Sequence, residues 1–352
     1  MKALVRIIGF GLILISLGAL GAAGLTNQTT PELTLQVRSV VSGWSDAPQV
    51  SESAMLAEAP TAAASVSVSP KLVTSNWQED VRTKPNSVTQ DVPAVPRQPF
   101  DRADLYYRLP STIPADKTVR ALVVLHGMGN RGDVFSRSLV AEADSHGWLL
   151  IAPTMRYGDW TNPEQLLKDD LLYTRMLRDT LDTLPSELGV KLRHHVLLLG
   201  FSRGAQLAQR FAFFYPERVQ TIAILSGGAY TLPQENLNAQ SGKQLLVLPY
   251  GVGDVQKHLG KPLNWTEFKK ITFWLGVGAN DNRKDDVPRM FDSYVGSNRV
   301  ERTQNLYNSL CAVGVDAHIA VFPNTDHEMT TEVRRAAVKF LREDEIADNL
   351  ND

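Results

Sequence analysis

The stretch VLLLGFSRGAQLAQRFAFFYPERV, residues 196–219, begins with a run of apolar residues and ends in an amphipathic pattern. The first part predicts a buried strand and the second part a helix. Ser202 stands between Gly200 and Gly204, where the strand should pass into the helix. Such a serine can simply cap the helix. Alternatively, a tight turn can hold its hydroxyl above the sheet edge as a nucleophile. The rest of the chain has to decide between these two interpretations.

Short apolar runs alternate with helical patterns on both sides of this stretch, from about residue 99 onward. Helices are predicted over 164–189, directly after Ser202, over 301–313 and over 329–343. The runs are rich in Val, Ile and Leu, as strands covered on both faces must be, and they occupy residues 119–126, 148–153, 195–200, 219–225, 271–277 and 317–322. This alternation predicts one α/β domain over 99–345, with a mostly parallel sheet between helices, and then an acidic tail at 346–352.

The N-terminal part of the chain has a different composition. Lys2 and Arg6 precede an uncharged apolar run, so residues 1–25 are typical of a signal peptide or an N-terminal membrane anchor. Residues 26–98 are rich in Ser, Thr, Ala, Val and Pro and predict a flexible linker. We therefore expect an exported protein, either extracellular or tethered to the outer side of a membrane.

Composition excludes several other classes of protein. The net charge of −2 gives no reason to expect a nucleic-acid partner. The single cysteine, Cys311, excludes an intrachain disulfide and a cysteine-based zinc site, and its helical surroundings predict a buried structural thiol. The chain has no His-x-x-x-His motif, so no metal is predicted. Nothing in the sequence indicates the oligomeric state.

Partners for Ser202 are expected just after other strands, because ligand sites in such sheets lie at the carboxyl ends of strands. His327, in FPNTDHEMT, follows the last predicted strand and is the expected general base. A histidine in this role needs a carboxylate to orient it. The stretch GVGANDNRKDDVPRM offers Asp281, which is nearest to the strand end and is our choice, with Asp285 and Asp286 as alternatives. Asp326 is a weaker candidate, because neighbouring side chains on a loop usually diverge and it directly precedes His327. The chain order Ser, Asp, His is that of α/β hydrolases.

A third strand end supplies the expected oxyanion hole. The segment VVLHGMGN, residues 123–130, ends a strand in a glycine-rich loop. We expect the backbone N–H groups of Met128 and Arg203 to stabilise an oxyanion. His126, Gly127 and Gly129 are expected to shape and support this loop, with the His126 imidazole acting through hydrogen bonds.

The motifs LHGMG, GFSRG, GANDN and NTDHEM, in this order, resemble the α/β-hydrolase superfamily over about residues 105–345. The segment HGMGNRGDVFSRSLVAEADSHGWLLIAP resembles its polyhydroxybutyrate-depolymerase and feruloyl-esterase-like branch. The resemblance implies a serine esterase that uses no cofactor and acts on a small-molecule or polymeric ester. Two alternatives stay open: an acyltransferase or peptidase on the same triad, and a catalytically silent exported binding module.

A substrate pocket is only weakly indicated. The longest excursion between predicted strands, residues 230–270, leaves the sheet on the expected active-site side, where a cap would lie. Arg203 and Arg156 are candidates to meet an acidic group of a substrate. Four aromatic residues are candidates for an apolar pocket: Trp160, Tyr230, Tyr250 and Trp265.

Overall fold

The computed structural model describes residues 97–239 and 242–349. The predicted signal or anchor at 1–25 and nearly all of the predicted linker at 26–98 lie outside these residues, so export and tethering stay predictions. Within the described ranges, no helix is long and apolar enough to cross a membrane.

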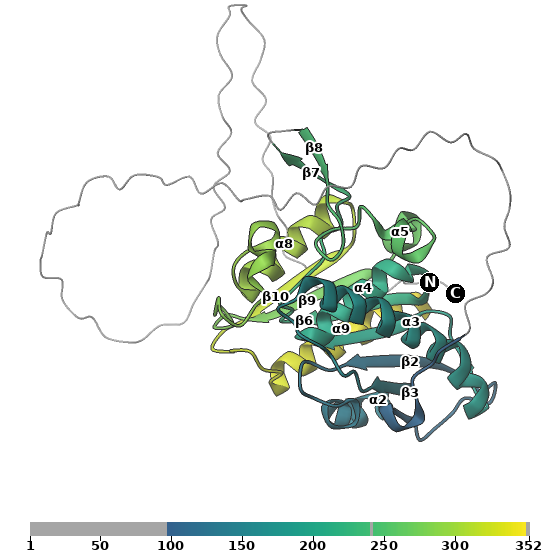
Figure 1. Ribbon diagram of the computed structural model, residues 1–352. Coiled ribbons are helices and arrows are strands. Elements are labelled where there is room, and N and C mark those ends of the chain that lie inside the picture. The colour runs from purple at the N-terminus through teal and green to yellow at the C-terminus, as the bar shows by residue number, and fades with distance from the viewer. Residues whose placement is uncertain (1–96, 240–241, 350–352) are drawn as a thin grey trace, which may run out of the picture. The chain divides into compact units, whose positions relative to one another are not determined.

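A central sheet of eight strands organises the described part of the chain (Figure 1). Neighbouring strands follow the order β1-β3-β2-β5-β6-β9-β10, and β4 pairs with β2. Every pair is parallel except β1 with β3. The six predicted strands and the mostly parallel sheet are thereby confirmed. The strands are β1 (Leu105–Arg108), β2 (Thr118–Leu125), β3 (Trp148–Pro153), β4 (Lys191–Leu192), β5 (Val196–Phe201), β6 (Val219–Leu225), β9 (Thr272–Gly278) and β10 (Ala317–Phe322).

Helices cover both faces of the sheet, as the alternation predicts (Figure 1). Successive strand residues point to opposite faces. Val123 accordingly belongs to the core cluster that includes residues of α3, α4 and α8, whereas Val124 belongs to the cluster that includes residues of α2 and α9. The longer helices are α2 (Val140–Ser145), α3 (Pro163–Leu188), α4 (Arg203–Phe214), α8 (Arg299–Ala312) and α9 (Thr331–Asn349). Shorter ones are α1 (Gly132–Phe135), α5 (Val255–Leu259), α6 (Trp265–Phe268) and α7 (Asp292–Val295), with 3₁₀ turns η1 (Arg102–Asp104), η2 (Ser136–Leu139), η3 (Pro216–Arg218) and η4 (Arg289–Phe291).

Strand register brings the carboxyl ends of the central strands to one edge. Leu125 of β2 pairs with Gly200 of β5, and Phe322 of β10 pairs with Gly278 of β9. The loops that follow these strands therefore meet, although they are far apart in the sequence. This edge is where ligand sites of open α/β sheets lie.

Local sequence signals explain the boundaries of α3. The Asn162 side chain accepts hydrogen bonds from the backbone N–H groups of Glu164, at 2.9 Å, and Gln165, at 3.1 Å. Pro163 occupies the first turn, where its missing N–H costs nothing. Gly189 ends the helix in the left-handed conformation, with φ 66°. The predicted span of 164–189 thus holds to within one residue at each end.

The C-terminal helices depart from the prediction in two respects. The helix α9 continues to Asn349, past residue 343 and into the stretch expected as a tail. Cys311 is exposed, so the prediction of a buried thiol is wrong. The reason is helical geometry: α8 turns Leu306 and Leu310 into the core, and the residue after Leu310 points about 100° away.

The excursion at 230–270 contains a hairpin that sequence patterns do not indicate. Strands β7 (Asn236–Ala239) and β8 (Gly242–Leu245) form a separate antiparallel pair, visible above the sheet in Figure 1. Leu232 and Leu246 pack in a small cluster with Phe291 and Val295. The excursion therefore packs against η4 and α7.

Folded contacts begin at Gln98, just before the predicted boundary at residue 99. The Gln98 N–H donates to Asp179 Oδ2 at 2.7 Å, and the Phe100 N–H donates to Thr180 Oγ1 at 3.0 Å. The Phe100 ring is buried and stacks on Tyr173 with a centroid separation of 6.0 Å. The start of the domain is thus attached to α3.

Candidate active site

Ser202 lies in a strained turn between β5 and α4. Its φ of 55° and ψ of −117° form a backbone conformation that non-glycine residues rarely adopt. A Cβ at Gly204 would lie 2.0 Å from the carbonyl oxygen of Leu125, and a Cβ at Gly200 would lie 2.4 Å from that of Gly204. Only glycine at these positions lets the helix start so close to the strands. The turn has the geometry of a nucleophile elbow, and Ser202 makes no side-chain capping bond.

His327 bridges Ser202 and Asp281. The distance from His327 Nε2 to Ser202 Oγ is 2.9 Å, and that from His327 Nδ1 to Asp281 Oδ2 is 2.7 Å. Because a carboxylate only accepts, Nδ1 carries the proton and Nε2 is free to accept from the hydroxyl. The ring stacks on Phe201, with centroids 4.9 Å apart, and this contact restricts its rotation. The structure thus brings together the three residues that the sequence singles out.

Two contacts between the loops after β9 and β10 bring Asp281 close to His327. The Asn280 N–H donates to the Thr325 carbonyl at 2.9 Å and joins the loops that follow β9 and β10. A Cβ at Gly278 would lie 2.3 Å from that same carbonyl oxygen, so a larger residue there would push the loops apart. The glycine-rich end of β9 therefore allows the acid and the base to meet.

The Asp281 carboxylate is fully buried, and both of its oxygens are used. Oδ2 faces His327, while Oδ1 accepts from Arg299 Nη1 at 2.9 Å. Burial by itself would raise the pKa of Asp281, but the His327 hydrogen bond and the Arg299 charge outweigh it, so this pKa lies below its usual value. No motif points to Arg299, because it begins an ordinary helix 18 residues after the acid.

The alternative carboxylates bind elsewhere. Asp286 and Asp326 each accept from Arg283 at 2.5 Å, in an exposed cluster. Asp326 also accepts from the backbone N–H of His327 at 2.8 Å, on the main-chain side of that residue. Asp285 and Asp286 line the cavity described below, whereas the hydrogen-bond partners of the His327 ring are Asp281 and Ser202.

The loop after β2 lies against Ser202. His126 is buried, its Nδ1 lies 2.7 Å from the Gly127 carbonyl oxygen, and its Nε2 accepts from the Met155 N–H at 2.9 Å. Burial lowers the pKa of His126, which favours the neutral ring that these two bonds require. A Cβ at Gly127 would lie 3.1 Å from Ser202 Cβ, whereas Gly129 has φ 67° and turns the chain.

The expected oxyanion donors belong to two residues that line the same cavity as Ser202. Arg203 is the first residue of α4, so its N–H has no carbonyl partner within the helix. Met128 and Arg203 both line the cavity that contains Ser202.

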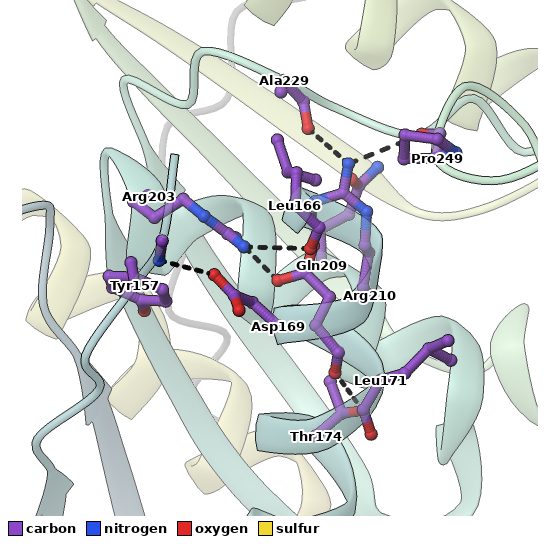
Figure 2. A network of polar contacts seen from close by, with 12 residues as sticks. Tyr157, Leu166, Asp169, Leu171, Thr174, Arg203, Gln209, Arg210, Ala229 and Pro249 are labelled. Carbon is purple, nitrogen blue, oxygen red and sulfur yellow. Dashed lines mark hydrogen bonds and ion pairs between the residues drawn. The ribbon is translucent and has the colours of Figure 1, made fainter. Parts of the chain in front are cut away.

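The Arg203 side chain points into the protein and cannot serve the substrate role considered above. Its Nη1 lies 2.7 Å from Asp170 Oδ1, an ion pair without hydrogen-bond alignment, and its Nη2 donates to the Leu166 carbonyl at 3.2 Å (Figure 2). The guanidinium stacks on Tyr157, 4.6 Å from the ring centre, and the Tyr157 hydroxyl reaches the His126 carbonyl at 3.4 Å. Arg156 is exposed and pairs with Asp104 instead.

A cavity of about 580 Å³ opens in front of Ser202 and His327. Its apolar lining includes Trp160, as predicted, and it also contains side chains that the sequence did not indicate: Phe135, Phe201 and Met329. The loop at 285–288 and Arg299 form part of its wall.

Three of the four predicted pocket aromatics lie elsewhere. Tyr230 is fully buried and its hydroxyl accepts from the Gly227 N–H at 2.9 Å. Tyr250 stacks on Tyr294 with centroids 4.6 Å apart, and Trp265 packs against Phe268. The 230–270 excursion packs on η4 and α7, and none of its described residues lines the cavity.

Comparison with known proteins bears on the fold. A family model described as the alpha/beta hydrolase fold matches residues 120–264. The chain has the α/β-hydrolase fold. The predicted fold and superfamily resemblance are confirmed, whereas the predicted branch stays a prediction. No curated protein matches this α/β-hydrolase-fold chain in sequence.

Several solved structures are similar to this chain to different degrees. Poly(aspartic acid) hydrolase-1 from Sphingomonas sp. KT-1 superposes with a TM-score of 0.51 at 18% identity, covering 67% of this chain and 92% of that one. The Bacillus cereus carboxylesterase gives 0.44 at 14% identity, covering 68% and 93%. A ferulic acid esterase from Anaeromyces mucronatus gives 0.45 at 15%, covering 69% and 86%. Likeness at these identities extends to the fold alone.

No metal site accompanies the cavity in the described ranges, where no group of three or more His, Cys, Asp and Glu side chains is placed to hold an ion.

Proposed function

We propose that the protein is a serine hydrolase that cleaves carboxylic esters through an acyl-enzyme, with Ser202 as nucleophile, His327 as general base and Asp281 as the orienting acid. The observation that carries the proposal is the unbroken contact from Ser202 Oγ through the imidazole to a buried carboxylate, at 2.9 Å and 2.7 Å. A serine hydroxyl becomes nucleophilic when a base is placed to remove its proton.

The reaction would follow from these contacts in two halves. His327 Nε2 takes the Ser202 proton as Oγ attacks the ester carbonyl, and the resulting imidazolium donates that proton to the leaving alcohol. A water molecule then attacks the acyl group on Ser202 while His327 Nε2 accepts a proton from it. The imidazolium returns this proton to Ser202 Oγ as the acyl–oxygen bond breaks and the acid is released. In both halves the N–H groups of Met128 and Arg203 would stabilise the negative oxygen.

The cavity supports a substrate with an apolar portion. Phe135, Trp160 and Met329 line it beside the nucleophile. Acyl or aromatic groups would gain about 25 cal/mol for each Å² of apolar surface removed from water. We therefore expect the rate on p-nitrophenyl esters to rise with acyl chain length until the cavity is filled.

Replacement of the nucleophile tests the proposal. Ser202→Ala should lower kcat on p-nitrophenyl esters by at least about 10⁴-fold and abolish labelling by a fluorophosphonate probe. Ser226→Ala is the matched control, because Ser226 also ends a strand with positive φ, at 51°, and does not contact His327. This control should keep both signals.

Three results would contradict the proposal. Full activity in a folded Ser202→Ala protein would show that Ser202 is not the nucleophile. Acyl transfer to an added alcohol or amine in preference to water, or cleavage of peptides in preference to esters, would favour the transferase or peptidase alternative. A wild-type protein that binds but neither reacts with the probe nor turns over would favour a silent binding module.

A further inference from the structure

We propose that Arg299 is a positioning residue with two roles. It favours the ionised form of Asp281 beside a neutral His327, and it holds the cavity-lining loop at 285–288 next to the triad. The proposal rests on the proposed function, because it gives Arg299 a role relative to His327 and Asp281. Arg299 occupies the Asp281 oxygen that His327 leaves free, since Nη1 donates to Oδ1 at 2.9 Å while His327 Nδ1 holds Oδ2 at 2.7 Å.

Burial makes this contact strong. The Asp281 and Arg299 side chains are 0% and 8% exposed, so water screens their interaction poorly. The guanidinium favours the ionised form of the Asp281 carboxylate. As a cation it is also repelled by a second positive charge on the neighbouring imidazole. Both interactions favour the reactive form of the triad, with the acid ionised and the base neutral.

Other charged groups near His327 are placed differently. Asp326 and Arg283 neutralise each other at 47% side-chain exposure, where solvent screens them. Arg203 lines the cavity but is neutralised by the buried Asp170. The titratable and charged groups around the imidazole and its acid are Asp281, Arg299, Tyr230, Arg203, Arg283, Asp285, Asp286 and Asp326.

The second arm of the same guanidinium holds the cavity wall. Arg299 Nη2 donates to the Asp286 carbonyl at 2.6 Å, and residues Asp285, Asp286 and Pro288 line the cavity. An arginine fork can serve two acceptors at once, which a lysine ammonium on its flexible stem does less well. Arg299 therefore joins the acid of the triad to the loop that lines the cavity.

Two substitutions separate these roles. Arg299→Met removes the charge and both bonds, so the acidic limb of the kcat/KM profile should move up by about one pH unit. Well below the midpoint, that shift lowers kcat/KM about tenfold. Arg299→Lys keeps a positive charge beside Asp281 but loses the fork. We expect its acidic limb to stay near that of the wild type, while KM rises several-fold and kcat changes little.

Arg302 provides the structural control. It lies one turn further along α8, is fully buried, and donates to the carbonyls of Gly228 and Pro288 and to Asp292. It thus holds the same loop region without a bond to Asp281. Arg302→Met should lower the melting temperature and leave the acidic limb in place.

The experiment measures kcat/KM on p-nitrophenyl acetate against pH for the wild type and the three variants. It also follows the His327 ring resonance by NMR over the same pH range, assigned by its loss in His327→Asn. The NMR midpoint needs no turnover, so it tests Arg299 even if the esterase proposal fails. An upward shift in Arg299→Met alone supports the inference. Equal shifts in Arg299→Met and Arg302→Met, or none in Arg299→Met, would overturn it.

Discussion

At the scale of single residues, Asp281 is distinguished from its acidic neighbours by burial and by its partners. It is fully buried between His327 and Arg299, whereas Asp286 is half-exposed and bound to Arg283. A carboxylate that bonds Nδ1 holds the imidazole in the tautomer that can accept from serine. A neutral amide at this position would favour the wrong tautomer.

We therefore expect Asp281→Asn to lower kcat/KM on one chosen ester by about 10⁴-fold, since this is the cost of the wrong tautomer. Asp285→Asn and Asp286→Asn serve as matched controls and should stay within a few-fold of the wild type. Circular dichroism checks that each variant is folded. If Asp286→Asn were the inactive variant, the acid would belong to the 285–288 loop.

The residues of the candidate triad could be predicted because each follows a strand whose apolar run is easy to recognise. Arg299 could not be predicted, since its contact with Asp281 depends on how α8 packs beside β9. Tyr230 and Tyr250 were misplaced for a related reason. Aromatic composition does not tell whether a side chain faces a cavity or, as these two do, a neighbouring element.

At the scale of elements, a buried charge cluster joins α3 to α4 behind the active site (Figure 2). Asp170 of α3 pairs with Arg203 and with Arg210 of α4, each at 2.7 Å. Arg210 also donates to the Ala229 carbonyl at 2.8 Å and to Thr231 Oγ1 at 2.9 Å. Burial lowers the pKa of Arg210 to about 10, because desolvation of the guanidinium outweighs the favourable charge of Asp170.

Removing the Asp170 carboxylate, which both arginines share, should therefore strongly destabilise the folded protein. Asp170→Asn leaves two buried guanidinium groups without a counter-charge, and we expect a loss of about 3–5 kcal/mol in unfolding free energy. Asp169→Asn is the control, because Asp169 bonds the Gly158 N–H and Gln165 without pairing with an arginine. Urea unfolding of both variants checks this, and equal losses would mean that the arginine pairing contributes little.

Elements differ in how well the sequence predicts them. Buried strands such as β5 were read correctly because a strand between two helical layers is apolar throughout. The edge strand β1 and the hairpin of β7 and β8 are short and partly polar, so no continuous run marks them. The end of α9 was placed too early because its last residues are polar and carry no stop signal.

At the scale of the whole molecule, the attachment of Gln98 and Phe100 to α3 decides where the chain can be cut. The unit that contains the candidate site extends from Ser87 to Asp352. The contacts of Gln98 and Phe100 follow shortly after this point, and the Phe100 ring is 5% exposed in the main core. All residues of the candidate site come later in the chain.

A chain that begins at Ser87 should therefore keep the esterase activity and melting temperature of the full chain. One that begins at Asp101 lacks the Phe100 ring, whose loss from the core costs about 3 kcal/mol. In a domain of this size that corresponds to a melting temperature lower by on the order of 10 °C.

Phe100→Ala in the full chain is the control, and it should account for most of the difference in melting temperature. Scanning calorimetry of the four proteins, with activity on one ester, measures both properties. If the Ser87 chain itself proved unstable or inactive, residues 1–86 would have to contribute to the catalytic region, and the boundary would lie earlier.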